Sequence, residues 1–197
     1  MTRRSTAIYT IMFLLLSTRL LYAGPAEKSQ PKAAPKGSAP KAADKEPGVA
    51  VPDLGNQHIR SIEDPHPPYN SKPPTSGHHV PFVAKWGIYQ SPIPNELQVH
   101  NLEDGGVIIQ YDCKDCKDMV QKIESLAQGY FQQAQAEKQK LQKSKYEHLL
   151  VAPYPGMDAP IVLTAWGRID KLPQFDEARI RRFIEAYIGI DHHPKNE

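Results

Sequence analysis

The sequence has only two cysteines, Cys113 and Cys116, and it lacks the short motifs of several large enzyme classes. It contains no G-x-S-x-G, no H-E-x-x-H and no glycine-rich phosphate loop. Nothing in it therefore indicates a serine hydrolase of that type, a zinc protease or a nucleotide-binding enzyme. Lys117 follows the second cysteine, where a covalent haem site needs histidine. The sequence assigns no reaction, and whether the protein is an enzyme stays open.

An excess of basic charge is also missing from most of the chain. The formal net charge of the 197 residues is only +2. Residues 53–197 hold sixteen basic and nineteen acidic side chains, so the positive excess lies in residues 1–52. A nucleic-acid-binding surface needs clustered lysine and arginine, and we therefore expect no nucleic-acid partner.

No hydrophobic run in the chain is long enough to span a bilayer comfortably. The apolar run at residues 7–16 follows Arg3 and Arg4 and leads to Ala23. A charged start, a short apolar stretch and a small final residue are typical of a secretory signal peptide, here residues 1–23. We expect an exported protein, periplasmic or extracellular, and an uncleaved segment that tethers it to the membrane is the alternative. No cysteine follows the run, which excludes a lipoprotein anchor.

Residues 24–52 contain no aromatic side chain and hardly any large aliphatic one. Such a segment buries too little apolar area to offset the entropy lost on ordering, which predicts a disordered linker. Its repeated Pro-Lys and Lys-Ala pairs favour an extended, semi-rigid tether. The simplest interpretation of this linker is a solvated spacer. The alternative is a segment that contacts the envelope or an anionic cell wall.

The remaining sequence predicts a single small α/β domain over residues 53–190, followed by a tail at 191–197. Prolines exclude long helices and central strands before residue 95, while scattered aromatic and aliphatic residues predict a long Pro-rich ordered loop region over a core. The rest of the domain predicts one sheet with two main helices packed on it. The expected strands cover 107–111, 149–152, 161–166 and a short piece through Ile169, and the helices begin near Asp112 and at Asp176.

Several short phrases occur together along this domain. They are Pro73–Gly77 with His79 shortly after, Gly87-x-Tyr89, Val99-His100-x-Leu102-Glu103-x-Gly105, Ala152-Pro153-x-Pro155 and Ala165-Trp166-Gly167-Arg168. In this combination the sequence resembles, over residues 60–190, the bacterial family known as domain of unknown function 3105. The resemblance implies an exported or membrane-tethered domain and assigns no activity. The family usually has histidine where this chain has Asp104, so a role that needs that imidazole is not carried over, although a carboxylate also ligates metals.

The histidines and carboxylates near residue 100 are the main candidates for chemistry. In one helical turn His100 shares a face with Glu103 and Asp104, at i+3 and i+4. A loop histidine such as His79 over the same strand end completes a donor set that suits zinc, copper or non-haem iron. In the structural alternative, His100 and Glu103 cap a turn and His79 bonds to loop backbone. The remaining histidines show no ligand spacing: His58, His66, His78, His148, His192 and His193.

Cys113 and Cys116 follow a predicted buried strand and open a helix. Thioredoxin-like oxidoreductases hold their redox pair in this place, where a helix N-terminus stabilises a thiolate, and the later strand–strand–helix order matches the second half of that fold. Against this, no strand–helix unit is evident before the pair, and Asp115 between the cysteines opposes a low thiol pKa. A structural disulfide is the simplest interpretation in an exported protein. A further interpretation is that the two cysteines stay reduced and bind a soft metal ion, with His100 nearby.

The best interpretation of the sequence alone is an exported envelope protein with a transition-metal site. One alternative is a periplasmic thiol–disulfide protein that uses the cysteine pair. The other is a non-catalytic envelope module that binds a protein partner. The metal hypothesis requires the His79 and His100 side chains to lie within about 5 Å of each other, because both must reach one ion.

Overall fold

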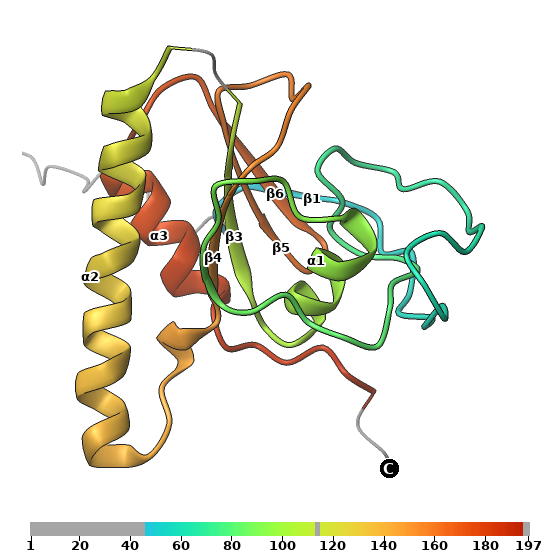
Figure 1. The fold of residues 1–197 in the computed structure, drawn as a ribbon, viewed down its shortest axis with the longest axis horizontal. Helices are drawn as coiled ribbons and strands as arrows, with labels where there is room; N and C mark the ends of the chain where they lie inside the picture. The colour runs from blue at the N-terminus through green and yellow to red at the C-terminus, as the bar shows by residue number, and fades with distance from the viewer. Residues whose placement is uncertain (1–45, 113–114, 195–197) are drawn as a thin grey trace, which may run out of the picture. The chain divides into compact units, whose positions relative to one another are not determined.

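The computed structural model describes residues 46–112 and 115–194. Within them the strands form one mixed sheet in the order β1-β6-β5-β3-β4-β2, which confirms the expected single α/β domain (Figure 1). β3 pairs in parallel with β4, and β4 with β2, whereas β5, β6 and β1 join the sheet antiparallel. In chain order the elements are β1 (Val49–Ala50), β2 (Gly87–Ile88), α1 (Asn95–Glu103), β3 (Val107–Tyr111), α2 (Lys117–Leu141), the 3-10 turn η1 (Lys145–Glu147), β4 (Leu149–Pro153), β5 (Ile161–Ala165), β6 (Arg168–Leu172) and α3 (Glu177–Tyr187).

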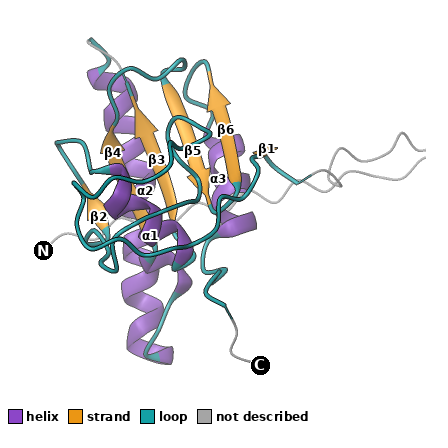
Figure 2. Ribbon diagram, turned by 90° about the vertical axis from the view of Figure 1, so that its right-hand side faces the viewer, coloured by secondary structure: helices purple, strands orange, loops and turns teal. Residues whose placement is uncertain are grey.

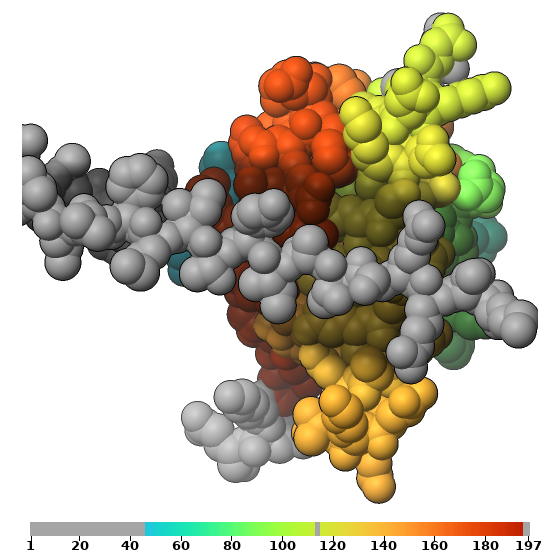
Figure 3. Space-filling view, turned by 90° about the vertical axis from the view of Figure 1, so that its left-hand side faces the viewer, coloured from blue at the N-terminus to red at the C-terminus, as the bar shows by residue number. Residues whose placement is uncertain are grey.

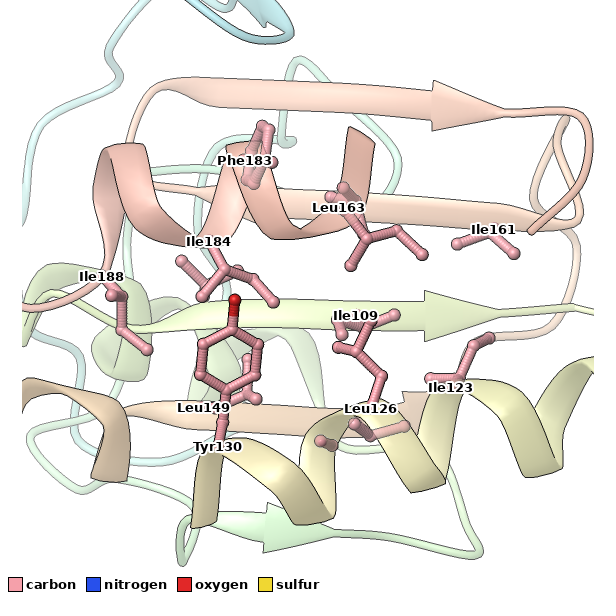
Figure 4. Packing of buried hydrophobic residues seen from close by; sticks show 14 of the residues in the cluster. Ile109, Ile123, Leu126, Tyr130, Leu149, Ile161, Leu163, Phe183, Ile184 and Ile188 are labelled. Atoms are coloured by element: carbon pink, nitrogen blue, oxygen red, sulfur yellow. The ribbon is translucent and has the colours of Figure 1, made fainter. Parts of the chain in front are cut away.

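The sheet buries apolar side chains on both faces, because alternate residues of a strand point to opposite sides. On one face Ile109 of β3 packs among side chains of α2 and α3, such as Leu126 and Ile184. On the other face Ile108 packs with Leu102 of α1. Figure 2 shows α1 and the loop region in front of the sheet, Figure 3 views the opposite face with α2 and α3, and Figure 4 shows the core beneath those two helices.

A strand–helix unit precedes β3, although none was evident in the sequence. β2 lies parallel to β4 at the edge of the sheet, and α1 leads from there into β3. β2 has only two residues, so it shows no alternating pattern. The polar residues Gln98, Asn101 and Glu103 are buried in α1, which removes the usual division into an apolar and a polar face.

The prediction that Asp112 or Cys113 caps the helix after β3 is wrong, because α2 begins at Lys117 and its N-cap residue is Cys116. The Asp112 carboxylate instead accepts backbone N–H hydrogen bonds from Gly156 (2.6 Å) and Met157 (3.1 Å). Asp112 therefore stabilises the turn after β4 and does not cap the helix. The polar sequence that follows Phe131 has a helix-compatible composition, and α2 continues through it to Leu141.

Residues 46–52 belong to the domain, although their composition places them in the linker. β1 forms the edge of the sheet and pairs with β6, with Val49 opposite Ile169. Gly48 has a φ of +74°, and a Cβ there would lie 2.8 Å from the Ile169 carbonyl oxygen, so the backbones approach closely. This contact uses main-chain atoms and leaves no hydrophobic signal in the sequence. The predicted signal peptide and most of the predicted linker lie in residues 1–45, outside the described residues. Among the residues that the structure describes, no helix is long and apolar enough to cross a membrane.

Candidate metal centre

The C-terminal end of α1 carries three of the four predicted donors. His100 and Glu103 lie in its last turn, and Asp104 follows directly. Gly105 then turns the chain into β3 with a φ of +79°, and a Cβ there would lie 2.8 Å from the backbone nitrogen of Ile190. Only glycine fits this turn, because the chain after α3 passes directly against it.

His79 reaches the same place from the loop region and is fully buried, with 0% of its surface exposed. Its backbone pairs with a second loop strand: the His79 N–H donates to the Gln57 carbonyl (3.1 Å), and the Ile59 N–H donates to the His79 carbonyl (2.8 Å). This parallel bridge sets His58 beside His79, with the two ring centroids 4.9 Å apart. His58, which no sequence spacing selects, is thereby brought to the predicted donors.

Glu103 lies at the centre of these side chains and is only 1% exposed. Its Oε1 accepts a hydrogen bond from the Asn56 amide (2.7 Å). Its Oε2 lies 2.8 Å from Nε2 of His79 and 3.9 Å from Nε2 of His58. A buried carboxylate is stable only when it is paired with hydrogen-bond donors, a proton or a cation, so its surroundings decide what the site does.

Two histidines are oriented by the backbone. Nδ1 of His79 lies 2.7 Å from the Gly77 carbonyl, and Nδ1 of His100 lies 2.9 Å from the Val80 carbonyl. A carbonyl only accepts, so each ring carries a proton on Nδ1, and Nε2 of the neutral ring is a lone-pair donor. Burial lowers the pKa of His79 and outweighs the hydrogen bond to Gly77 and the charge of Glu103. Nε2 of His79 lies within hydrogen-bond distance of Oε2 of Glu103, and a shared proton or a bound cation would satisfy both atoms.

One ligand atom from each of His58, His79, His100 and Glu103 lies within 4.8 Å of the other three. The ring centroids of His79 and His100 are 5.0 Å apart, as the metal hypothesis requires. Ligands on one tetrahedral zinc ion lie about 3.3 Å apart, so the group closes around an ion by small side-chain rotations. His58 is the exposed member, with 46% of its side chain accessible, and has the most room to rotate.

Asp104, which the sequence analysis predicts as a donor, lies outside that group. Its Oδ1 is 3.8 Å from Nε2 of His100 and 3.7 Å from Nδ1 of His193, and these three residues form a second, overlapping group. His193 belongs to the predicted tail, yet the tail lies against the site: the His192 N–H donates to the Glu103 carbonyl (2.9 Å). Sequence spacing therefore misses the contact of these tail histidines with the site.

Cys116 lies at the opposite end of β3 from the histidines. Asp104 precedes the first residue of β3, whereas Cys116 follows the last one and directly precedes α2. A strand of five residues spans about 17 Å, so the idea of a soft-metal pair near His100 is wrong. Cys113 lies outside the described residues, and the predicted disulfide stays a prediction.

Comparison with known proteins gives one match. A family model described as "Protein of unknown function (DUF3105)" matches residues 63–197, a range that includes His79, His100 and Glu103. The match confirms the resemblance seen in the sequence. No curated protein and no solved structure matches the chain.

Proposed function

The chain belongs to the DUF3105 family of proteins of unknown function, and because membership assigns no activity, we propose a function from the geometry of the site. The protein is an exported domain that binds one transition-metal ion. His79, His100 and Glu103 are the principal ligands, and His58 is the fourth. The export part of this proposal rests on the signal-like leader at residues 1–23.

One observation carries the proposal: three imidazoles gather around a buried carboxylate, and one ligand atom from each of the four residues lies within 4.8 Å of the other three. Nε2 of His79 faces Oε2 of Glu103 at 2.8 Å, while Nδ1 of the same ring is committed to the Gly77 carbonyl. Backbone hydrogen bonds at the second ring nitrogen are also the usual device that orients metal-ligating histidines.

The chemistry of the donors limits the choice of metal. The group offers three imidazoles and one carboxylate, and no sulfur ligand lies among its members. Imidazole suits zinc, copper and iron, whereas calcium and magnesium prefer oxygen ligands throughout. Trp166 provides a reporter, since its ring centroid lies 6.2 Å from that of His79. Bound Cu²⁺ is therefore expected to quench the fluorescence of this tryptophan.

Thermal unfolding with and without metal tests the proposal. An ion at a hundredfold excess over its Kd stabilises a folded state by about 2.7 kcal/mol, and for a chain of this size that raises Tm by about 5–11 °C. His100→Ala removes the shift. His66→Ala retains it, because His66 pairs with Glu96 away from both donor groups. A wild-type chain whose Tm does not respond to Zn²⁺, Cu²⁺ or Fe²⁺ would contradict the proposal.

A second candidate function, thiol–disulfide chemistry, is favoured by the unit β2–α1 ahead of β3. In the sequence alone, no such unit is evident before the cysteine pair, which speaks against a thioredoxin-like arrangement; β2 and α1 remove that objection. The Cys113–Cys116 motif stands in the sequence between the central strand β3 and the helix α2. A dithiol redox titration tests this candidate. The test is independent of the metal proposal, because we expect His100→Ala to leave the redox potential of the two thiols unchanged.

A further inference from the structure

The chain after α3 returns to the metal centre. This C-terminal segment, residues 188–194, leaves α3 and runs beneath α1 in the view of Figure 1. The Gly189 N–H donates to the Gly105 carbonyl (2.7 Å), and the His192 N–H donates to the Glu103 carbonyl (2.9 Å). Gly189 has a φ of +81°, which favours glycine and permits the reversal of direction after the helix.

The segment brings His193 to the carboxylate at the centre of the site. Nε2 of His193 lies 3.6 Å from Oε2 of Glu103, closer than Nε2 of His58 at 3.9 Å. This separation is close to the distance of about 3.3 Å between two ligands of one zinc ion. Nδ1 of His193 lies 2.8 Å from Oδ1 of Asp191, so a partner holds one ring nitrogen and leaves the other toward Glu103. His79 and His100 have the same arrangement, with carbonyls in place of the carboxylate.

We propose that His193 is a further ligand of the bound ion, and that ion binding fastens the C-terminal segment to the centre. This inference rests on the proposed metal-binding function. His193 shares a donor group with His100 and Asp104, so it would join the ion from the side of His100, and zinc is able to expand from four ligands to five. His193 is 39% exposed, whereas His79 and Glu103 are buried, so it lies on the solvent side of the centre.

Without an ion, the ring of His193 has one hydrogen bond, to Asp191, and longer contacts with Glu103 (3.6 Å) and Asp104 (3.7 Å). Its close partner Asp191 is exposed and belongs to the same segment, so their hydrogen bond does not attach the segment to the domain. Ion pairs of exposed groups contribute little to stability. A coordination bond at Nε2 would tie the segment to Glu103 and His100, on α1. Ion binding is therefore expected to restrict the motion of residues that lie outside every helix and strand.

Zinc affinity and hydrogen exchange in the full chain test the inference. Kd for Zn²⁺ is measured by competition with a chromophoric chelator for the wild type, His193→Ala, His192→Ala and His100→Ala. His192 is the matched control, because its ring stacks on Trp166 at 6.0 Å and belongs to neither donor group. We expect His193→Ala to raise Kd about tenfold or more, a loss typical of groups that hold a metal site together, and His192→Ala to leave Kd nearly unchanged.

Zn²⁺ should also slow amide exchange at Gly189 and His192 in the wild type, and it should not do so in His193→Ala. Wild-type affinity in His193→Ala, combined with loss of binding in His100→Ala, would overturn this inference and leave the proposed function standing. An equal loss in His193→Ala and His192→Ala would overturn it as well, because the effect would then belong to the segment and not to the imidazole. Failure of the wild type to bind Zn²⁺, Cu²⁺ or Fe²⁺ would overturn the proposed function itself.

Discussion

The side chain of Asn101 joins α1 to the loop that follows His79, and its removal should uncouple the two. Asn101 is fully buried. Its Oδ1 accepts a hydrogen bond from the Ala84 N–H (2.8 Å), and its Nδ2 donates to the Ala84 carbonyl (2.8 Å). Both hydrogen bonds link an α1 side chain to loop backbone, so Asn101→Ala leaves both main-chain groups of Ala84 without their partner.

The expected loss follows from these two groups. Each buried backbone group without a partner costs about 1–3 kcal/mol, so Asn101→Ala should lower the free energy of unfolding by about 2–6 kcal/mol. Water that enters the space left by the amide can bond to these groups and reduce the cost, so we expect the loss in free energy of unfolding to fall in the lower half of that range. A loss of about 3 kcal/mol lowers Tm by about 6–12 °C in a chain of this size. Urea denaturation with a chelator present measures the change for the metal-free protein.

Asn70→Ala is the matched control, because Asn70 makes one exposed hydrogen bond to the Pro52 carbonyl (2.7 Å). It should cost about 1 kcal/mol or less. Zn²⁺ should recover part of the stability lost in Asn101→Ala, since coordination at His79 fastens the same loop. An Asn101→Ala chain as stable as Asn70→Ala would refute the view that this amide holds the loop over α1.

Three further predictions concern pH, the cysteines and the N-terminus. Burial lowers the pKa of His79 below its ordinary value of 6.5, so the unfolded chain binds the proton more readily. The metal-free domain should therefore keep this contribution to stability above pH 6.5 and lose it as the pH falls further, and an equally steep loss in His79→Gln would argue against this origin. Thiol labelling of the denatured, unreduced protein should find neither Cys113 nor Cys116, and labelling of both would contradict the disulfide. Deletion of residues 1–52 should lower Tm relative to deletion of residues 1–45, because only the longer deletion removes β1, and equal values would show that β1 adds no stability.

The elements that could be predicted from the sequence are those with a local signal. β3, β4 and β5 are short apolar runs, and they occupy the middle of the sheet where both faces are buried. α3 begins after Asp176, whose carboxylate accepts the Arg179 N–H (3.0 Å) as an N-cap. β1 and β2 could not be predicted, because two-residue edge strands are defined by backbone pairing and not by side-chain pattern.

The candidate site divides in the same way. His100, Glu103 and Asp104 stand at helical spacing, so their common location could be inferred from positions in the sequence alone. His58 is placed by a backbone bridge between two irregular segments, and His193 by the return of the chain after α3. Neither arrangement has a periodic signal, since each depends on contacts between distant parts of the chain.

The metal content of the full chain tests the central claim most directly. The wild type, His79→Ala and His100→Ala are dialysed against buffered Zn²⁺, Cu²⁺ or Fe²⁺ and then against metal-free buffer, and bound metal is measured by elemental analysis. We expect one equivalent of at least one of these metals in the wild type and a small fraction of that in both variants. Sub-stoichiometric metal in the wild type with all three ions, or undiminished metal in both variants, would contradict it.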